Sequence, residues 1–285
     1  MTTARMVRGP QVERLAHEVA HGRAVERCAR VGYAARGAVY AIIGVLAVKV
    51  ALHEGGRTTN SKGALTELAA QPFGAVLLAL LSLGLVGFVV WRFVQAFMDP
   101  EGKGHDAKGL ARRAMYLGSG LVYAGLALNA VKLLAGRAHS AGADHTQSWT
   151  ARLLAQPFGQ VLVGLVGVGI IAFAVQQVHS AWKQKFLRQL DLGRLAASRR
   201  HLAVQVSRIG LAARGVVFFT VGVFLVRAAL HANAREAKGL GQALSALSRQ
   251  PWGDVLLGAV AVGLVAYAVY QLVVARCRRI AAPAH

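Results

Sequence analysis

The chain of 285 residues has few charged side chains and very few acidic ones. Asp, Glu, Lys and Arg together make up 16% of it, whereas about 25% is typical of soluble globular domains. Apolar residues make up 55%, and the mean hydropathy is +0.45. A soluble protein of this composition would expose large apolar patches and aggregate. The composition therefore excludes an ordinary soluble domain and predicts an integral membrane protein.

Cysteine is also scarce. The chain has two, Cys28 and Cys277. The topology derived below places both on the cytoplasmic side, where thiols stay reduced. A structural zinc site needs about four ligands, and no Cys and His residues have suitable spacing. We therefore expect no metal and no cofactor.

Acidic residues are missing from the deep part of every apolar segment, and Asp254, at the start of the last segment, comes closest. Coupled transporters usually carry a carboxylate inside the membrane, so this absence disfavours proton- or sodium-coupled transport. No Ser/His/Asp or Cys/His constellation falls in one membrane plane, and no glycine-rich phosphate loop is present. We expect a protein that is not an enzyme.

The first 30 residues hold six arginines but lack the apolar core of a signal peptide. Apolar residues recur at helical spacing from Val12 to Ala20, which is typical of a basic amphipathic helix on a membrane surface. A solvated basic tail is an equal alternative. In either case residues 1–27 form a cytoplasmic N-terminal segment.

Six long apolar segments dominate the rest of the chain, each near or above the ~20 residues that cross a bilayer as a helix. They lie at residues 31–52, 72–97, 113–135, 157–181, 208–231 and 251–275. None alternates with period two, as a barrel strand would. The fold class is therefore all-α integral membrane, with six transmembrane helices.

Basic residues are unevenly divided between the two sides of this arrangement. The side that carries both termini holds twenty Lys and Arg, and the loops at 53–71, 136–156 and 232–250 hold seven. Cytoplasmic loops are enriched in Lys and Arg. The pattern predicts a multi-pass protein of the cytoplasmic membrane with both termini inside.

A threefold internal repeat is the strongest signal in the sequence. Gln-Pro-Phe-Gly at 71–74 recurs at 156–159 and, as Gln-Pro-Trp-Gly, at 250–253. Proline is favoured at the first position of a helix, so we expect this motif to begin the second helix of each repeat. Leucines at helical spacing before the motif predict a short amphipathic helix on the outer surface, with a re-entrant segment as the less favoured alternative.

A second motif marks the first helix of each repeat. Arg-Val-Gly-Tyr-Ala-Ala-Arg-Gly at 30–37 recurs as Arg-Ile-Gly-Leu-Ala-Ala-Arg-Gly at 208–215, whereas the middle copy has Ser119 where the others have Arg36 and Arg214. Two helices per repeat give the copies one common orientation, which predicts pseudo-three-fold symmetry about the membrane normal. The repeats span 28–98, 99–182 and 207–277, with a basic amphipathic cytoplasmic linker at 183–206 and a tail at 278–285.

Small residues at helical spacing mark the faces on which these helices pack. On the first helices we expect close helix contacts at Gly37 and Gly44, at Gly120, and at Gly215 and Gly222.

In both motifs and in its triplication, the chain resembles the bacterial membrane proteins grouped as domain of unknown function 1206. The resemblance covers almost everything from residue 28 to 277. It implies a six-helix protein of the bacterial cytoplasmic membrane and no established activity. Ser119 and Leu211 depart from the repeated pattern, which suggests that the three copies no longer contribute equally.

Three basic residues occupy one repeat-equivalent position, about one turn before the outer end of each first helix: Lys49, Lys132 and Arg227. Ionisable groups in a spanning helix are functional candidates. Their side chains either snorkel to the lipid headgroups or gather at the pseudo-three-fold axis and hold an anion or a lipid phosphate.

The secondary candidates are other polar residues inside the spans. Arg36 and Arg214 lie near the cytoplasmic ends, where anchoring by the positive-inside rule is the ordinary role. The remaining candidates, for which bonding between helices is the ordinary role, are Asn129, Gln95, Gln176, Gln177, Gln271 and His179.

Two functions fit these observations. The first is a non-enzymatic bundle that binds or passively passes anionic solutes or lipids. The second is an accessory protein that acts through basic cytoplasmic surfaces, chiefly the 182–208 loop, on anionic lipid or a protein partner. Basic charge at a membrane face points to anionic lipid rather than nucleic acid, and nothing in the sequence indicates a homo-oligomer.

Overall fold

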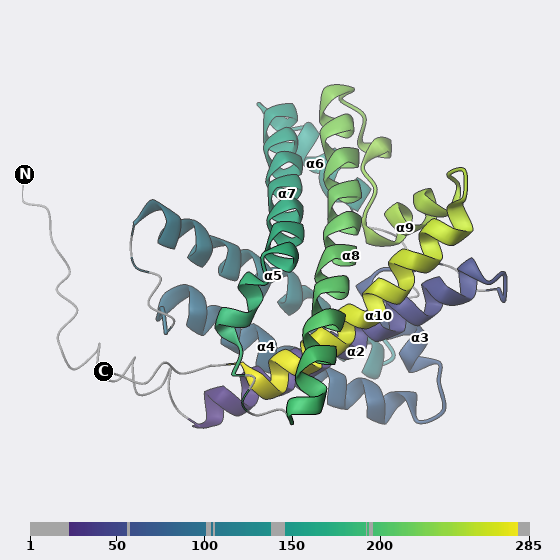
Figure 1. Ribbon diagram of the computed structural model, residues 1–285. Helices are drawn as coiled ribbons and strands as arrows, with labels where there is room; N and C mark the ends of the chain where they lie inside the picture. The colour runs from purple at the N-terminus through teal and green to yellow at the C-terminus, as the bar shows by residue number, and fades with distance from the viewer. Residues whose placement is uncertain are drawn as a thin grey trace, which may run out of the picture.

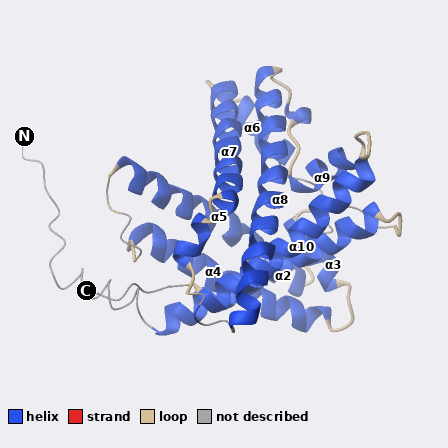
Figure 2. Cartoon of the chain, in the orientation of Figure 1, coloured by secondary structure: helices blue, strands red, loops and turns tan. Residues whose placement is uncertain are grey.

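The computed structural model describes residues 23–55, 58–100, 104, 106–137, 146–191, 193 and 196–278. The described residues form helices joined by loops, without a strand (Figure 1) (Figure 2). The predicted N-terminal segment lies outside the described residues up to residue 22, and so does the tail beyond Arg278.

Each repeat consists of a long helix, a short helix and a second long helix. The first repeat has α2 (Arg23–Ala51), α3 (Ser61–Ala69) and α4 (Gly74–Phe97); the second has α5 (Ala107–Leu134), α6 (Thr146–Leu154) and α7 (Gly159–Trp182); the third has α8 (Ala197–Leu230), α9 (Leu240–Ser248) and α10 (Gly253–Cys277). Two 3₁₀ turns, η1 (Lys185–Gln189) and η3 (Ala234–Glu236), flank α8. The three predicted short outer helices are thus present as α3, α6 and α9.

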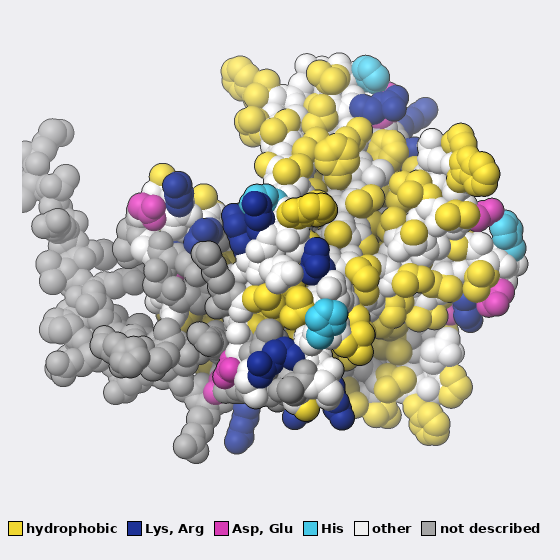
Figure 3. Space-filling model, in the orientation of Figure 1, with side chains coloured by type: hydrophobic (Ala, Val, Ile, Leu, Met, Phe, Trp, Pro, Cys, Tyr) yellow, Lys and Arg dark blue, Asp and Glu magenta, His cyan; other side chains and the backbone are white. Residues whose placement is uncertain are grey.

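The six long helices are each long and apolar enough to cross a membrane. Apolar side chains also spread over much of the surface seen in Figure 3, which a soluble protein would not tolerate. The chain is therefore a multi-pass membrane protein. Helix α2 begins before its apolar segment. In this first part Glu26 accepts hydrogen bonds from Arg30 one turn later, at 2.6 and 2.9 Å, a pair that supports the helix.

The Gln-Pro-aromatic-Gly motif forms a turn that precedes the second helix, so the prediction that proline occupies the first helical position is wrong. The amide of Gly74 donates to the carbonyl of Gln71 over 2.8 Å, and Phe73 has a φ of 61°. Proline at the second position and a positive φ at the third are typical of a type II turn. Helix α4 begins at Gly74, where a Cβ atom would lie 2.6 Å from the carbonyl oxygen of Leu68.

The same turn precedes α7 and α10, where Phe158 and Trp252 also have φ values of 62°. The three aromatic side chains at this position are more than four-fifths exposed: Phe73 84%, Phe158 82% and Trp252 85%. Aromatic rings are enriched where a membrane meets water, and the motif places one exposed ring just before the second long helix of each repeat.

The long helices pack in a cyclic order, in which each first helix lies against the second helix of the preceding repeat. Helix α5 packs on α4, α8 on α7, and α2 on α10, so that the last repeat contacts the first. The predicted glycine stripes lie in these contacts. A Cβ at Gly37 would lie 3.1 Å from Ala268 of α10, one at Gly120 3.2 Å from Phe93 of α4, and one at Gly215 2.7 Å from Val178 of α7.

Two arginines at equivalent positions reinforce this cyclic order. Arg30, at the start of α2, donates to the carbonyls of Ala275 and Arg276 at the end of α10, both at 2.7 Å. Arg113, at the start of α5, donates to the carbonyls of Ala96 and Phe97 at the end of α4. These carbonyls have no partner within their own helix, and a cation there also suits the helix dipole.

The middle repeat differs from the other two in its internal packing. Helices α2 and α4 pack together, as do α8 and α10, whereas no comparable packing joins α5 and α7 in the part of the chain that the structure describes. At Gly32 a Cβ would lie 2.5 Å from the backbone nitrogen of Phe88, and Gly210 meets Tyr267 equally closely. The middle repeat has Met115 at this position. A side chain there prevents the close approach that glycine allows, so α5 and α7 stay apart.

Candidate anion-binding site

Two arginine side chains are buried where the three repeats meet. Arg36 of α2 and Arg214 of α8 are 6% and 7% exposed. Arg36 stands fifteen residues before Ala51, the end of its helix, which at 1.5 Å per residue is about 22 Å. The hydrocarbon of a bilayer is ~30 Å thick, so these guanidinium groups lie well inside the predicted membrane. Their burial does not fit the predicted role as surface anchors.

Four aromatic rings surround the guanidinium of Arg36. Its Cζ lies 5.3 Å from the ring centroids of Phe88 and Tyr123, 5.8 Å from that of Tyr267 and 5.9 Å from that of Tyr40. A cation within about 6 Å of a ring face is attracted by the ring electrons, by ~2 kcal/mol or more where water is excluded. Its Nε is buried and has no hydrogen-bond partner among the described residues.

Arg214 lies in a matching set of rings. Its Cζ is 4.5 Å from the centroid of Phe218, 5.0 Å from Tyr267, 5.4 Å from Phe173 and 5.7 Å from Tyr40. Its guanidinium also donates hydrogen bonds to the hydroxyl of Tyr40 at 3.2 Å and to Oε1 of Gln177 at 2.6 Å.

The six rings around the two arginines form two repeat-equivalent sets. The first helices supply Tyr40, Tyr123 and Phe218, and the second helices supply Phe88, Phe173 and Tyr267. All three repeats therefore build one cluster, which we call the arginine cage: Arg36 and Arg214 with these six rings. Ser119, half-buried on α5, stands where the middle repeat would supply a third arginine.

Three further polar residues at one equivalent position lie on the second helices: Arg92, Gln177 and Gln271. Arg92 is 4.8 Å from the centroid of Phe88 and 5.2 Å from that of Tyr116, and it donates to Oε1 of Gln95 at 2.8 Å. Nε of Arg92 and the side-chain amide nitrogens of Gln177 and Gln271 are buried without a hydrogen-bond partner among the described residues. Several N–H donors in this region thus lack an acceptor.

Among the described residues, no carboxylate balances the charge of the cage. Within the described residues neither Arg36 nor Arg214 forms an ion pair. The acidic residues that do form ion pairs lie at or near helix ends. Arginine stays protonated in proteins. The cage is therefore a positively charged region with unused donors, buried among the three repeats.

The basic triplet lies elsewhere. Lys49, Lys132 and Arg227 are all exposed, and Nε of Arg227 is 3.5 Å from a carboxylate oxygen of Glu236. No hydrogen bond or ion pair connects the three residues within the described structure. Exposure near the outer helix ends is the geometry that snorkelling requires, and whether the triplet holds an anion stays a prediction.

The remaining candidates are divided between the interior and the surface. Gln95 is buried at 1% exposure beside Arg92, and Asn129 is half-buried on α5. Gln176 is exposed, and so is His179, whose Nε2 lies 3.0 Å from Nζ of Lys185. Gln177 bonds between long helices, because its Oε1 accepts a hydrogen bond from Arg214 of α8.

The sequence does contain a signal for the cage that was not used. Arg36 precedes Tyr40 by four residues, and Arg214 precedes Phe218 by four. Residues four apart lie on one helix face, so each arginine shares its face with an aromatic residue. The second-helix rings also recur at the spacing of the Pro turns, which would have placed them on the same core.

A comparison with known protein families finds the same three repeats. The family model described as Domain of Unknown Function (DUF1206) matches three segments, residues 31–99, 114–184 and 209–278. An uncharacterized Bacillus subtilis (strain 168) protein, YxxB, is 36% identical over 248 residues, which cover 87% of this chain and 89% of that protein. No solved structure matches the chain significantly.

Proposed function

This chain belongs to the DUF1206 family of three-repeat proteins, and we propose that it binds an anionic, phosphate-like group at the arginine cage. The observation that carries the proposal is the burial of two guanidinium groups, Arg36 and Arg214, which form no ion pair with any carboxylate that the structure describes. The role would be non-enzymatic: the protein would bind this group, or let it pass, within a bundle of the bacterial cytoplasmic membrane.

Electrostatics supports an anionic ligand rather than a purely structural cage. Removing an ion from water costs several kcal/mol even after the protein relaxes. A cation–π contact returns about 0.5–2 kcal/mol, depending on how far water is excluded, and the two arginines also repel one another. A bound anion would offset this buried charge and accept hydrogen bonds from donors such as Nε of Arg36, which has no partner among the described residues. Guanidinium groups match the oxygen spacing of phosphate, which favours bidentate contacts.

The source of the phosphate group is either a soluble oxyanion or a lipid headgroup. Both share the chemistry that the cage recognises, and the depth of Arg36 in α2 is compatible with either. With both termini inside, as the basic residues predict, the cage lies nearer the cytoplasmic face. A lipid headgroup would then come from the inner leaflet.

The accessory-protein alternative loses part of its basis. It depended on the basic amphipathic 182–208 loop after α7, which would act on anionic lipid or a protein partner. In the structure Phe186 and Leu190 of this segment are each 5% exposed, and the ring of Phe186 packs against Tyr270 of α10 at 5.8 Å. These apolar side chains contact the protein itself, so the partner would have to recognise the basic side chains alone.

Equilibrium binding to the purified protein in an uncharged detergent tests the proposal. Inorganic phosphate and a short-chain phosphatidic acid, measured by calorimetry, distinguish a soluble anion from a headgroup. We expect saturable binding of at least one of them, and a loss of about tenfold or more in affinity in R36Q and in R214Q, because a charged hydrogen-bond partner is removed.

The exposed R227Q variant is the matched control, since it removes the same charge outside the cage. Unchanged affinity in both R36Q and R214Q would contradict the proposal. Unchanged affinity in R227Q together with losses in the cage variants would support it.

A further inference from the structure

A groove of about 410 Å³ runs along the outside of the bundle between α7 and α8. Val175, Val178 and Trp182 of α7 and Gly215, Val216 and Phe219 of α8 line it. Its walls are almost entirely apolar, and its volume lies in the ~300–1,000 Å³ range of ligand pockets. Because Val175, Val216 and Phe219 are each 42–54% exposed, the groove is open along its length to the surroundings of the helices.

Close packing of the two helices makes the floor of this groove. A Cβ at Gly215 would lie 2.7 Å from Cγ2 of Val178 and 3.1 Å from the carbonyl oxygen of Ala174. The equivalent interfaces of the other repeats carry larger side chains than Val178, namely Phe93 on α4 and Leu272 on α10. The ring of Phe93 lies 3.2 Å from where a Cβ of Gly120 would be. The groove thus lies at the interface that has the smallest side chain at this position.

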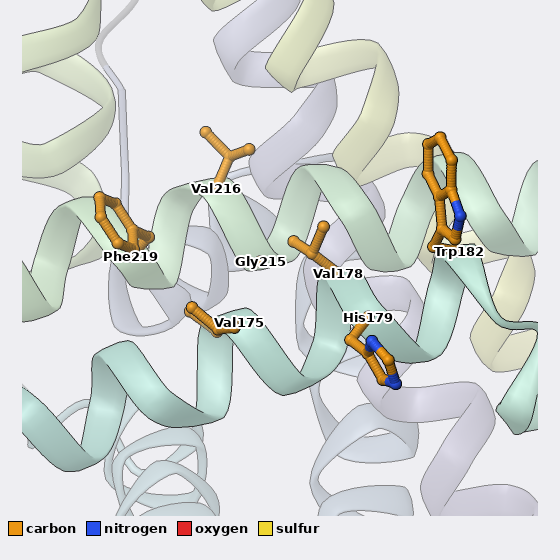
Figure 4. A pocket seen from close by; sticks show the side chains of 8 residues that line it. Val175, Val178, His179, Trp182, Gly215, Val216 and Phe219 are labelled. Atoms are coloured by element: carbon orange, nitrogen blue, oxygen red, sulfur yellow. The ribbon is translucent and has the colours of Figure 1, made fainter.

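One end of the groove is polar. Figure 4 shows His179 and Trp182 at one end and Phe219 toward the other. Nζ of Lys185, just past the end of α7, lies 3.0 Å from Nε2 of His179. When the ammonium donates to Nε2, the proton of the neutral imidazole is on Nδ1. The pair then presents a positive charge and several outward donors.

This polar end is also particular to the α7–α8 interface. The positions equivalent to His179 are Val94 on α4 and Val273 on α10. Trp182, which is 76% exposed, suits the boundary between hydrocarbon and headgroups. The order along the groove is therefore apolar wall, aromatic ring and basic pair, which is also the order of chemistry along a phospholipid molecule.

We propose that this groove binds one anionic phospholipid, with an acyl chain along Val175, Val216 and Phe219 and its phosphate at His179 and Lys185. Charge complementarity argues for an anionic headgroup, because the pair at the mouth is cationic. The site is independent of the arginine cage, since Arg36 and Arg214 are buried in the bundle interior and line no part of the groove.

Native mass spectrometry of the full chain in an uncharged detergent tests this site. Phosphatidylglycerol and phosphatidylcholine with identical acyl chains are titrated, with glycerol phosphate as a headgroup without chains. We expect one phosphatidylglycerol to be retained about tenfold more tightly than phosphatidylcholine, and glycerol phosphate not to compete at matched concentration.

Two variants separate headgroup from chain recognition. H179V combined with K185Q gives α7 the valine of the sister repeats and removes the charge, and it should abolish the preference for phosphatidylglycerol. V216W fills the groove and should reduce retention of both lipids. The controls are K108Q, which removes an exposed lysine at the start of α5, and L165W, which places the same ring on an exposed part of α7.

Equal retention of the two lipids by the unmodified protein would overturn the proposal, and so would a preference that survives H179V/K185Q. Full competition by glycerol phosphate would overturn the acyl-chain part and leave a site for a free phosphate. R36Q should leave the lipid preference unchanged, so that a failure here is distinguishable from a failure of the arginine cage.

Discussion

The guanidinium of Arg214 in the third repeat donates a hydrogen bond to the hydroxyl of Tyr40 in the first, with 3.2 Å between Nε and oxygen. The ring of the same tyrosine lies 5.9 Å from the guanidinium carbon of Arg36, its neighbour one turn earlier on α2. Tyr40 therefore joins the two charges of the cage and connects the two ends of the repeated sequence. The cage is both the meeting point of the repeats and the main concentration of buried charge.

Removing the Tyr40 hydroxyl should weaken this junction. Y40F leaves a buried charged donor with one acceptor fewer, which costs about 1–3 kcal/mol. We expect a lower midpoint of thermal unfolding in detergent, followed by the fluorescence of a thiol-reactive dye. Y123F is the control, because no hydrogen bond of its hydroxyl holds an arginine in the described structure. Equal loss in both variants would mean that the hydrogen bond between Arg214 and Tyr40 has no specific stabilising effect.

Alanine at two equivalent glycines should have opposite effects on stability. At Gly263 an added Cβ collides with that of Ala213, whereas at Gly169 nothing lies within 4 Å. G263A should destabilise the protein by about 1–3 kcal/mol through overpacking. G169A should be neutral or stabilise it by ~0.5–1 kcal/mol, because alanine favours helix. The unfolding midpoints of the pair check this, and a large loss in G169A would show that α5 and α7 pack closely after all.

Reporter fusions should reveal the orientation of the spans. The excess of basic residues on one side predicts that fusions after residues 60, 145 and 240 behave as extracytoplasmic. Fusions after residues 105 and 195 and at the C-terminus should behave as cytoplasmic. Alkaline phosphatase and green fluorescent protein, active on opposite sides, give matched readouts at each position. A clean inversion at any adjacent pair would break the six-span topology.

The spans, the repeats and the glycine contacts could be predicted from the sequence because each depends on local pattern. The length of an apolar segment identifies a membrane helix, and the repeated Gln-Pro-aromatic-Gly motif identifies where the second helix of each repeat begins. The exact helix start was missed because Phe73, at φ 61°, uses a backbone conformation that non-glycine residues adopt rarely. No composition signal marks such a residue as the end of a turn.

The sequence predicts only part of the cage: the i, i+4 spacing puts each arginine on one helix face with an aromatic ring, but it does not show that these faces point inward and meet. Arg36 and Arg214 lie near the cytoplasmic ends of their spans, where a positive-inside anchor is the ordinary role. The open middle repeat was missed for another reason. Met115, Gly32 and Gly210 lie at one repeat position, and the apolar pattern that predicts a span does not distinguish their side-chain volumes, which decide whether the helices can meet.

The most direct test of anion binding at the cage measures thermal unfolding of variants that neutralise either the two cage arginines or the three outer basic residues. A ligand at 100 times its dissociation constant stabilises a protein by ~2.7 kcal/mol, so phosphate or phosphatidic acid at that level should raise the unfolding midpoint. The account predicts that the rise disappears in the double variant R36Q/R214Q and persists in the triple variant K49Q/K132Q/R227Q, whose side chains are exposed. A rise that persists in R36Q/R214Q and disappears in the triple variant would contradict the account and assign the anion site to the outer triplet.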